Sequence, residues 1–394
     1  MSVALFACRV ATAASLVISG LFMTAYAPDS RAADQIQVAD PILTGSILFS
    51  RSRYDSNASP YATALYRASA GGGVATSLTP QTSGTLDLGA RWSPRGRAIV
   101  FERVNTAEWF KQSEIYRMDR DGKSLRPITI GQSRHQDPTW GRYNNWIAYL
   151  DGGVDQHQCV ALVRPNGNEQ HTLFCPSPSD GTLFAPQWTP GEKQLLVEIH
   201  YYDWHSSTLN PPAISDVYKV DALTGKATRI SHLIFAEAED DLQFSPDGTR
   251  ALYRWNETSG MEIVDFATGK TLGSEANGPY GDSPRWSNDS QQIAFTREIF
   301  LPNSTSEIFG AVFVIRADGT HARQLTNKPV ANDYYYAVDW SDDDTHILLD
   351  RTRQVIHGLH ANQIYSVHVL DVRTQAITDV TDNGIASQGA WKQL

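Results

Sequence analysis

The stretch RWSPRGRAIVFER (91–103) decides the fold, because close variants of it recur along the chain. Each variant starts at an aromatic residue, passes through a short turn and ends in an apolar strand: TWGRYNNWIAYLD (139–151), QWTPGEKQLLVEI (187–199), QFSPDGTRALYRW (243–255), RWSNDSQQIAFTR (285–297) and DWSDDDTHILLDR (339–351). A seventh copy is split between SILFSR (46–51) and AWKQL (390–394). A strand-turn-strand unit with a period of about fifty residues is typical of a propeller or another repeat architecture.

The repeat predicts an all-β protein, namely a seven-bladed β-propeller of four-stranded antiparallel blades that occupies 46–394 as a single domain. The aromatic anchors are Trp92, Trp140, Trp188, Phe244, Trp286, Trp340 and Trp391. We expect each large ring to pack between neighbouring blades. The C-terminal strand around Trp391 is expected to join the N-terminal blade, which closes the ring without an exposed sheet edge. The alternative is six full blades with a frayed seventh.

The N-terminus has the features of an export signal. Arg9 supplies a positive charge, residues 10–27 are mostly small and apolar, and Ser30 and Ala32 are small residues suited to cleavage before Ala33. We therefore expect 1–32 to be a cleaved export signal and 33–45 a short extension, in a periplasmic or secreted protein. An uncleaved membrane anchor is the alternative, since the apolar run is at the lower limit for spanning. No later segment is apolar enough to span a bilayer.

Cysteine usage agrees with export. Cys8 lies in the signal, and Cys159 and Cys175 are equidistant from Gly167 in the turn that separates them. A hairpin centred on that turn places the two cysteines opposite each other, so we expect a disulfide in an oxidising compartment. Two buried free thiols are the alternative.

The composition and net charge limit the classes of molecule that this protein is expected to bind. The chain has 41% hydrophobic and 19% charged residues, as an ordinary globular protein does, and its net charge is −10. The negative charge, and the lack of any stripe of lysine and arginine, disfavour a nucleic-acid partner. We expect a monomer.

The repeat also resembles a known family. The pattern W-S-P-x-G-x-x-I-x-F, then I-Y-x-M-D-x-D-G, then L-T is similar to the TolB-type, WD40-like propeller repeat, most clearly in FSPDGTRALY (244–253), IYRMDRDGKSLRPIT (115–129) and FVIRADGTHARQLT (313–326). The resemblance implies the fold over about 46–394 but says little about function. It extends to periplasmic TolB, peptidase propellers and oligogalacturonate lyases. We expect the propeller alone, without the α/β domain of TolB or the G-x-S-x-G hydrolase domain of the peptidases.

Ligands of propellers usually bind at the channel mouth, where the loops between second and third strands and between blades open. Several of these loops are rich in aromatic, acidic and histidine residues. The candidate ligand-binding residues are His135, Asp137, His200, Tyr201, Tyr202, Asp203, Trp204, His205, Glu237, Glu239, Asp240, Asp333, Tyr334, Tyr335, His357 and His360. Rings stack on the apolar faces of sugars or peptides, and carboxylates accept hydrogen bonds or pair with amines. The alternative is that the rings cover the ends of the core and the acids are solvated.

No residue is assigned a catalytic role, because no nucleophile lies in an elbow motif. We expect no cofactor and no metal site, although histidines from three loops could converge on a divalent metal. Glu237 and Glu239 could alternatively form an acid-base pair. The favoured function is a scaffold that binds a protein, peptide or glycan at the channel mouth. The alternative is a metal-assisted carbohydrate lyase or hydrolase like the oligogalacturonate lyases, against which the net negative charge argues, since it repels acidic sugars.

Overall fold

The fold is built from β-strands and one short 3-10 helix, η1 (Thr106–Glu108), within the part of the chain that the computed structural model describes. The described residues are 45–54, 60–108, 112–152, 157–177, 181–184, 186–202, 213–235, 243–254, 261–268, 270–275, 281–304, 307–327, 329–357, 360–381 and 386–392. The expected export signal lies outside these ranges. Among the described residues, no helix is long and apolar enough to cross a membrane.

The first sheet joins the two ends of the described chain. Its strands run in the order β29 (Ala386–Lys392), β1 (Ser46–Tyr54), β2 (Pro60–Ser69), β4 (Thr85–Trp92), β5 (Ala98–Asn105), β6 (Ser113–Asp119) and β7 (Arg126–Pro127), with β3 (Thr76–Ser77) paired to β2. The last strand runs antiparallel to the first, and Trp391 pairs with Ile47. This pairing of the chain ends is the one that the split repeat predicts. A short parallel pairing of β2 with β4 joins two four-stranded units into this sheet.

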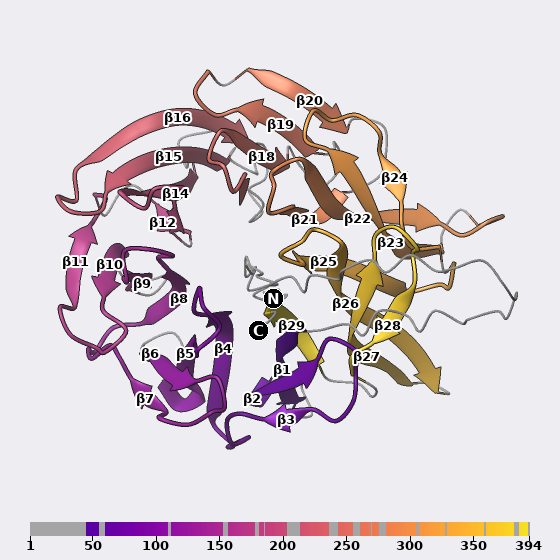
Figure 1. Cartoon of the computed structure of the whole chain (residues 1–394), viewed down its shortest axis with the longest axis horizontal. Helices are drawn as coiled ribbons and strands as arrows, with labels where there is room; N and C mark the ends of the chain where they lie inside the picture. Colours follow the sequence, from indigo (N-terminus) through magenta and orange to yellow (C-terminus); the bar gives the residue numbers. More distant parts are fainter. Residues whose placement is uncertain are drawn as a thin grey trace, which may run out of the picture.

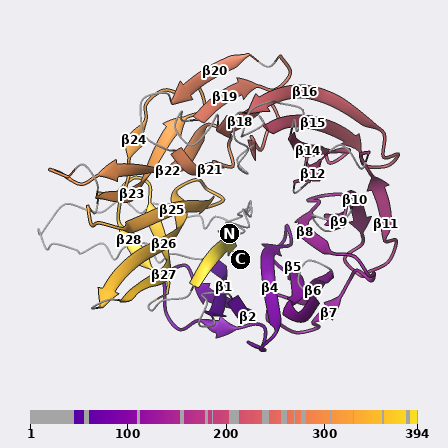
Figure 2. The same cartoon turned by 180° about the vertical axis from the view of Figure 1, so that it is seen from behind.

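The remaining sheets follow in chain order around a common centre, as Figure 1 shows from one side and Figure 2 from behind. The second sheet holds β8 (His135–Trp140), β9 (Ile147–Asp151), β10 (Cys159–Val163) and β11 (His171–Phe174). The third holds β12 (Thr182–Leu183), β13 (Gln187–Trp188), β14 (Gln194–Tyr202), β15 (Ala213–Asp221) and β16 (Ala227–Phe235). The fourth holds β17 (Gln243–Phe244), β18 (Arg250–Arg254), β19 (Met261–Asp265) and β20 (Thr271–Glu275).

The fifth sheet again combines two four-stranded units. It holds β21 (Gly281–Trp286), β22 (Gln292–Phe300), β23 (Ile308–Arg316), β24 (Arg323–Gln324), β25 (Asp333–Trp340), β26 (His346–His357), β27 (His360–Asp371) and β28 (Ile377–Asp379). Apart from two short parallel contacts, β2 with β4 and β23 with β25, the strand pairings are antiparallel. The prediction of an all-β fold made of four-stranded antiparallel units is therefore confirmed.

The strands that end in the aromatic anchors lie on the inner side of their units, as β4, β8, β21 and β25 do in Figure 1. We call these the inner strands. Neighbouring inner strands contact one another, for example β29 with β4 and β4 with β8. The indole N–H of Trp188 donates to the Thr139 carbonyl at 3.3 Å, and that of Trp340 donates to the Arg285 carbonyl at 2.9 Å. These two anchors thus tie their inner strands to the previous ones, in agreement with a packing role.

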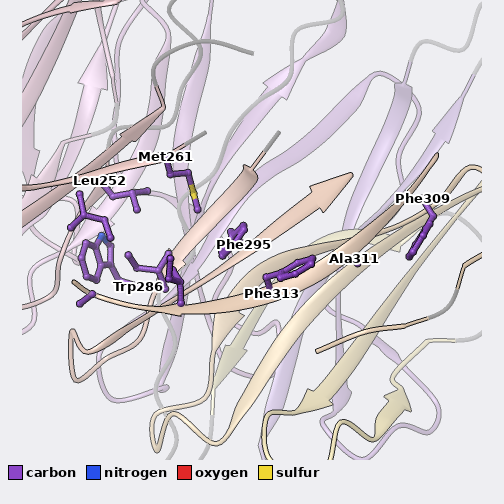
Figure 3. Close-up of a cluster of buried hydrophobic side chains, with 11 residues drawn as sticks. Leu252, Met261, Trp286, Phe295, Phe309, Ala311 and Phe313 are labelled. Atoms are coloured by element: carbon purple, nitrogen blue, oxygen red, sulfur yellow. The ribbon is translucent and has the colours of Figure 1, made fainter. Parts of the chain in front are cut away.

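Neighbouring units pack through apolar faces. Figure 3 shows one such contact, where Leu252 and Met261 of the fourth sheet meet Trp286, Phe295 and Phe313 of the fifth. Second strands such as β5 are apolar on both faces at their start, and Ile99, Val100 and Phe101 are fully buried. This is expected for a strand with a neighbour on either side and a sheet above and below it.

The expected disulfide is present. Cys159, at the start of β10, is bonded to Cys175, just beyond β11, with a Cα–Cα distance of 4.3 Å. The two strands form the hairpin around Gly167 that the sequence predicts. The bridge fixes the outer edge of the second sheet.

We expect replacement of both cysteines, Cys159→Ser with Cys175→Ser, to lower the free energy of unfolding by about 3 kcal/mol, the loop-closure entropy of a loop of this length. Urea unfolding with and without dithiothreitol measures the effect. The reductant should destabilise the wild type and leave the double variant unchanged. Equal sensitivity of both proteins to the reductant would contradict a disulfide at this place.

Candidate functional site

Inner strands β4, β8 and β21 each carry a β-bulge just before their aromatic anchor. Three residues before each anchor the backbone φ is positive: 59° at Gly89, 53° at Asp137 and 52° at Ser283. Glycine adopts this conformation readily, whereas for aspartate and serine it is strained. Bulges and strained residues concentrate beside functional sites, where they re-aim side chains. The centre of the molecule is therefore the first place to look for a site.

Charged side chains from three other inner strands act on Arg91 (β4), and we call the four residues the central charge cluster: Arg91, Asp137 (β8), Arg285 (β21) and Asp339 (β25). Burial lowers the pKa of the Arg91 guanidinium to about 10. The carboxylates of Asp137 and Asp339 oppose this shift, and the Arg285 guanidinium adds to it. Because buried charges interact strongly only over short distances, the cluster brings both signs of charge together at the centre.

The members of the cluster differ in how firmly they are held. The Arg285 side chain donates to the carbonyls of Val338 at 2.8 Å and Pro284 at 2.6 Å. Among the described residues, the Arg91 side chain donates to the Ala90 carbonyl alone, at 3.4 Å. Within the described ranges, no carboxylate is in ion-pair contact with Arg91. Arg91 is therefore the cation best placed to bind an incoming group.

Beside the cluster, Arg134 Nε forms an ion pair with Glu102 Oε1 at 3.1 Å, and both side chains are largely buried. Burial raises the pKa of Glu102, an effect that Arg134 opposes and Asp137 reinforces. Burial likewise raises the pKa of Asp137 itself, while Arg91 and Arg134 pull it down. The charges at the centre are thus poorly hydrated, so a ligand that carries complementary charges would gain more there than at the open surface.

Among the residues singled out from the sequence, Asp137 belongs to this site and His135 does not. His135 is 1% exposed, its Nδ1 is 2.7 Å from Glu114 Oε2, and its Nε2 is 3.4 Å from Asp151 Oδ1. Its ring also packs edge-on against Tyr149. His135 therefore joins the first and second sheets through β6, β8 and β9, and it is occupied by partners within the protein.

His200 has a similar place one sheet further on. It is buried on β14, its Nε2 is hydrogen-bonded to Glu198 of the same strand, and its ring centroid lies 4.1 Å from that of Phe184. For the neighbouring Tyr201 and Tyr202, and for His357 and His360 in the β26–β27 hairpin, the structure describes the backbone alone. The candidates Asp203, Trp204, His205, Glu237, Glu239 and Asp240 lie outside the described residues.

The aromatic run before Trp340 has divided roles. Asp333 is 1% exposed and forms a two-pronged ion pair with Arg351, at 2.7 and 2.5 Å. Tyr335 is 2% exposed and packs in the core. Tyr334 is half-buried and stacks on Tyr336 with ring centroids 6.1 Å apart. Of the three candidates in this run, Tyr334 therefore has the most open ring face for a ligand.

A metal centre needs several histidine, cysteine or carboxylate ligands that converge on one point. In the described part of the chain, no group of three or more His, Cys, Asp or Glu side chains is placed to hold a metal ion. His135 and His200 lie on different sheets, and each already contacts a carboxylate. The metal hypothesis would need side chains that the structure does not describe, such as those of His357 and His360.

Sequence reasoning missed Arg91, Arg285 and Asp339. It searched the loops for aromatic and acidic runs, but these three residues lie within strands. A signal was present, since each charged residue directly precedes an anchor tryptophan.

His135 gives a pH-dependent prediction. Burial disfavours its charged form, but the hydrogen bonds to Asp151 and Glu114 outweigh burial and raise the pKa of His135 to about 9. Because this value lies above that of an unfolded histidine, the stabilisation is complete below about pH 6.5 and is lost as the pH rises through 9. At about 1.36 kcal/mol per pKa unit, the contribution is on the order of 3 kcal/mol.

We therefore expect the His135→Gln variant to be less stable than the wild type at about pH 6 and to lose much less stability between about pH 6.5 and 9.5. Urea unfolding across this range measures both effects. The exposed His321, changed to Gln, is the matched control and should behave as the wild type does. If the free energy of unfolding changed equally with pH in the wild type and in His135→Gln, His135 would not be charged between Glu114 and Asp151.

Comparison with known proteins bears on the fold. No protein-family model matches the sequence, and no curated protein shows significant similarity to it. Among solved structures, a puromycin hydrolase is 15% identical, with a TM-score of 0.60 over 88% of this chain and 54% of that one. An oligogalacturonate lyase in complex with manganese is 12% identical, with a TM-score of 0.58 over 86% of each chain. TolB from Acinetobacter baumannii is 15% identical, with a TM-score of 0.46 over 76% of this chain and 67% of that one.

This chain spans about half the length of the puromycin hydrolase. At such identities the likeness concerns the fold alone. The lyase and the hydrolase are propeller proteins that the described chain matches over most of its length. The expectation from the repeat is thereby confirmed: the chain has a TolB-like propeller fold.

Proposed function

We propose that this chain is an exported, soluble TolB-like propeller that binds a protein, peptide or glycan at the mouth of its channel. The observation that carries the proposal is the central charge cluster, in which Arg91, Asp137, Arg285 and Asp339 come from four inner strands. The strained backbone at Asp137 supports it, since strain at a bulge is retained where it serves a site. Export is proposed from residues 1–32 and is consistent with the disulfide.

The balance of charges favours a peptide. Two guanidinium groups and two carboxylates, of which Asp339 is buried and the others are half-buried, complement a ligand that bears both an acidic and a basic group. A peptide segment offers these together with backbone donors and acceptors, whereas a neutral glycan offers hydroxyl groups only. The half-buried pair of Tyr334 and Tyr336 adds a stacking surface on β25. A protein partner would then insert a charged segment toward the centre.

The binding site depends on a ring, and we propose that the ring has seven blades and is closed by β29. The inner strands of these blades would be β29, β4, β8, β13, β17, β21 and β25. Supporting contacts join successive inner strands in two series. In the first, β29 contacts β4, β4 contacts β8, and β8 contacts β13; in the second, β17 contacts β21, β21 contacts β25, and β25 contacts β29. The pairing of β29 with β1 covers the edge of a strand in which Ile47, Leu48 and Phe49 are fully buried.

Deletion of residues 386–394 tests this closure. Without β29, the apolar edge of β1 would be exposed and unpaired, so we expect thermal unfolding at a temperature lower by several degrees, with increased aggregation. Deletion of 393–394 alone is the control, because it leaves β29 intact. An unchanged unfolding temperature in the longer deletion would argue against a ring that relies on this strand.

Binding at the centre is tested with peptides selected against the immobilised protein from a random library. For peptides that bind the wild type, we expect Arg91→Gln and Asp137→Asn each to weaken binding by about tenfold or more, because each removes a charge-assisted contact in a desolvated site. Fluorescence anisotropy with labelled peptides measures the affinity. The exposed Arg97, changed to Gln, is the control and should bind as the wild type does.

The same variants applied to a glycan array separate the two kinds of partner. Oligosaccharide binding that depends on Arg91, without any selected peptide, would assign the site to a glycan. Peptide binding that is equal in the wild type, Arg91→Gln and Asp137→Asn would place the binding surface elsewhere and contradict the proposal.

A second candidate function is a metal-assisted carbohydrate lyase, favoured by the structural likeness to an oligogalacturonate lyase in complex with manganese. That likeness concerns the fold, and the two described candidate histidines are engaged by carboxylates. Elemental analysis of the purified protein separates the candidates. Stoichiometric manganese, zinc or calcium that is lost in His200→Ala or His357→Ala would favour the lyase.

A further inference from the structure

A second feature of the repeat lies on the second strands, away from the central cluster. Near the end of the second strand, three units place an arginine over two aromatic rings: Arg51 over Phe49 and Tyr66, Arg103 over Phe101 and Tyr116, and Arg297 over Phe295 and Phe313. The guanidinium carbon of Arg51 lies 5.5 and 4.7 Å from its two ring centroids, and that of Arg103 lies 5.3 and 4.6 Å from its own. The repeat therefore reproduces one cation–π arrangement closely.

In the unit of β4 and β5, this arginine is neutralised by a carboxylate from the inner strand. Arg103 Nε lies 2.6 Å from Asp87 Oδ1, and its Nη2 lies 2.9 Å from Asp87 Oδ2. The two residues are directly opposite each other in the register of β4 and β5. Asp333 gives Arg351 the same two-pronged contact. A stacked guanidinium that presents its fork to a carboxylate is thus a recurring element of this fold.

The unit at the chain ends keeps the arginine and lacks the acid. The residue opposite Arg51 in the register of β1 and β29 is Ala386, which stands where Asp87 stands beside Arg103. Arg51 is half-buried, and among the residues that the structure describes no carboxylate is in ion-pair contact with it. The fork of Arg51 is therefore oriented by two rings and, within the described part of the chain, is not paired with a carboxylate.

Arg51 also lines a pocket of about 780 Å³ beside β28 and the segment that follows β2. The remaining lining residues are Gly73, Val74, Ala75, Asp379, Val380 and Thr381. Asp379 is the acidic group in this lining, and its Oδ1 is 2.8 Å from His368 Nδ1. Its carboxylate also acts on the Arg351 guanidinium, which is itself paired with Asp333. The pocket thus offers a guanidinium that has no ion-pair partner among the described residues, in a space that is large enough for a small organic ligand.

We propose that Arg51 anchors a second ligand site, in which a carboxylate of the ligand takes the place that Asp87 occupies beside Arg103. The site is distinct from the central cluster and does not depend on the function proposed above. The shared chemistry is a carboxylate that accepts two hydrogen bonds from one guanidinium. Such a group is carried by an acidic sugar or by an acidic peptide.

The test uses the mature protein with the disulfide intact and carbon-13-labelled acetate as the probe. Line broadening of the acetate signal at constant ionic strength, with chloride as the balancing anion, reports the affinity. We expect saturable binding to the wild type. We expect Arg51→Gln and Ala386→Asp each to weaken it by about tenfold or more, the first by removing the fork and the second by filling it from within the protein.

Ala386→Asp keeps Arg51 and should restore the pairing seen in the next unit, so it remains informative if Arg51→Gln fails to fold. The exposed Arg97, changed to Gln, is the matched control, because it removes a guanidinium from the surface and from neither site. Acetate binding that survives Ala386→Asp, that is lost in Arg97→Gln, or that is not saturable in the wild type would overturn the proposal.

Competition then distinguishes the two sources of the carboxylate. Glucuronate represents an acidic sugar, and N-acetylglutamate represents an acidic peptide. Either compound should displace acetate from the wild type and fail to bind Ala386→Asp. The stronger competitor identifies the class of ligand, and failure of both compounds to displace acetate would contradict a pocket that admits more than the bare anion.

Discussion

The geometry of the inner strands constrains the rest of this molecule. Each inner strand ends in a large ring that must be buried between units, and two of the tryptophans also donate their indole N–H to the backbone of the preceding inner strand. In a regular strand, successive side chains point to opposite faces of the sheet, so the direction of the anchor would fix the directions of all its neighbours. The bulges before the anchors of β4, β8 and β21 release that constraint. The same short segment of each of these strands therefore positions both the buried anchor and the residues beside the bulge.

Electrostatic pairs hold the units together around this frame. His135 lies between Glu114 and Asp151 and so links three strands of two sheets. Glu102 and Arg134 connect the same two sheets nearer the centre. Loss of one partner from such a buried pair is costly, because the remaining charge is left unpaired. These pairs specify the position of one unit relative to the next. Apolar faces alone would define that position less precisely.

The sequence predicted the repeat, the anchors, the disulfide and the pairing of β29 with β1, because each depends on local spacing or on a residue pattern that recurs. It predicted the candidate site less well. Asp333 and Tyr335 are candidates because they are polar or aromatic residues near a loop. In the structure Asp333 pairs with Arg351, and Tyr335 is buried in the core. Which partner a charged residue finds depends on contacts between distant strands. The charged residues before Trp92, Trp286 and Trp340 carried the clearer signal, since charge is rare beside a buried anchor.

Repetition also makes differences between units informative. A residue that several units share, such as the arginine that stacks on two rings in three units, is explained by the common fold. A residue that changes while its surroundings persist is not explained in this way. Asp87 and Ala386 occupy equivalent positions opposite Arg103 and Arg51, and the rings beneath the two guanidinium groups keep nearly the same distances. A stacked arginine without its acid leaves charge uncompensated at some cost in stability. Its retention is understandable if the missing carboxylate comes from outside the chain.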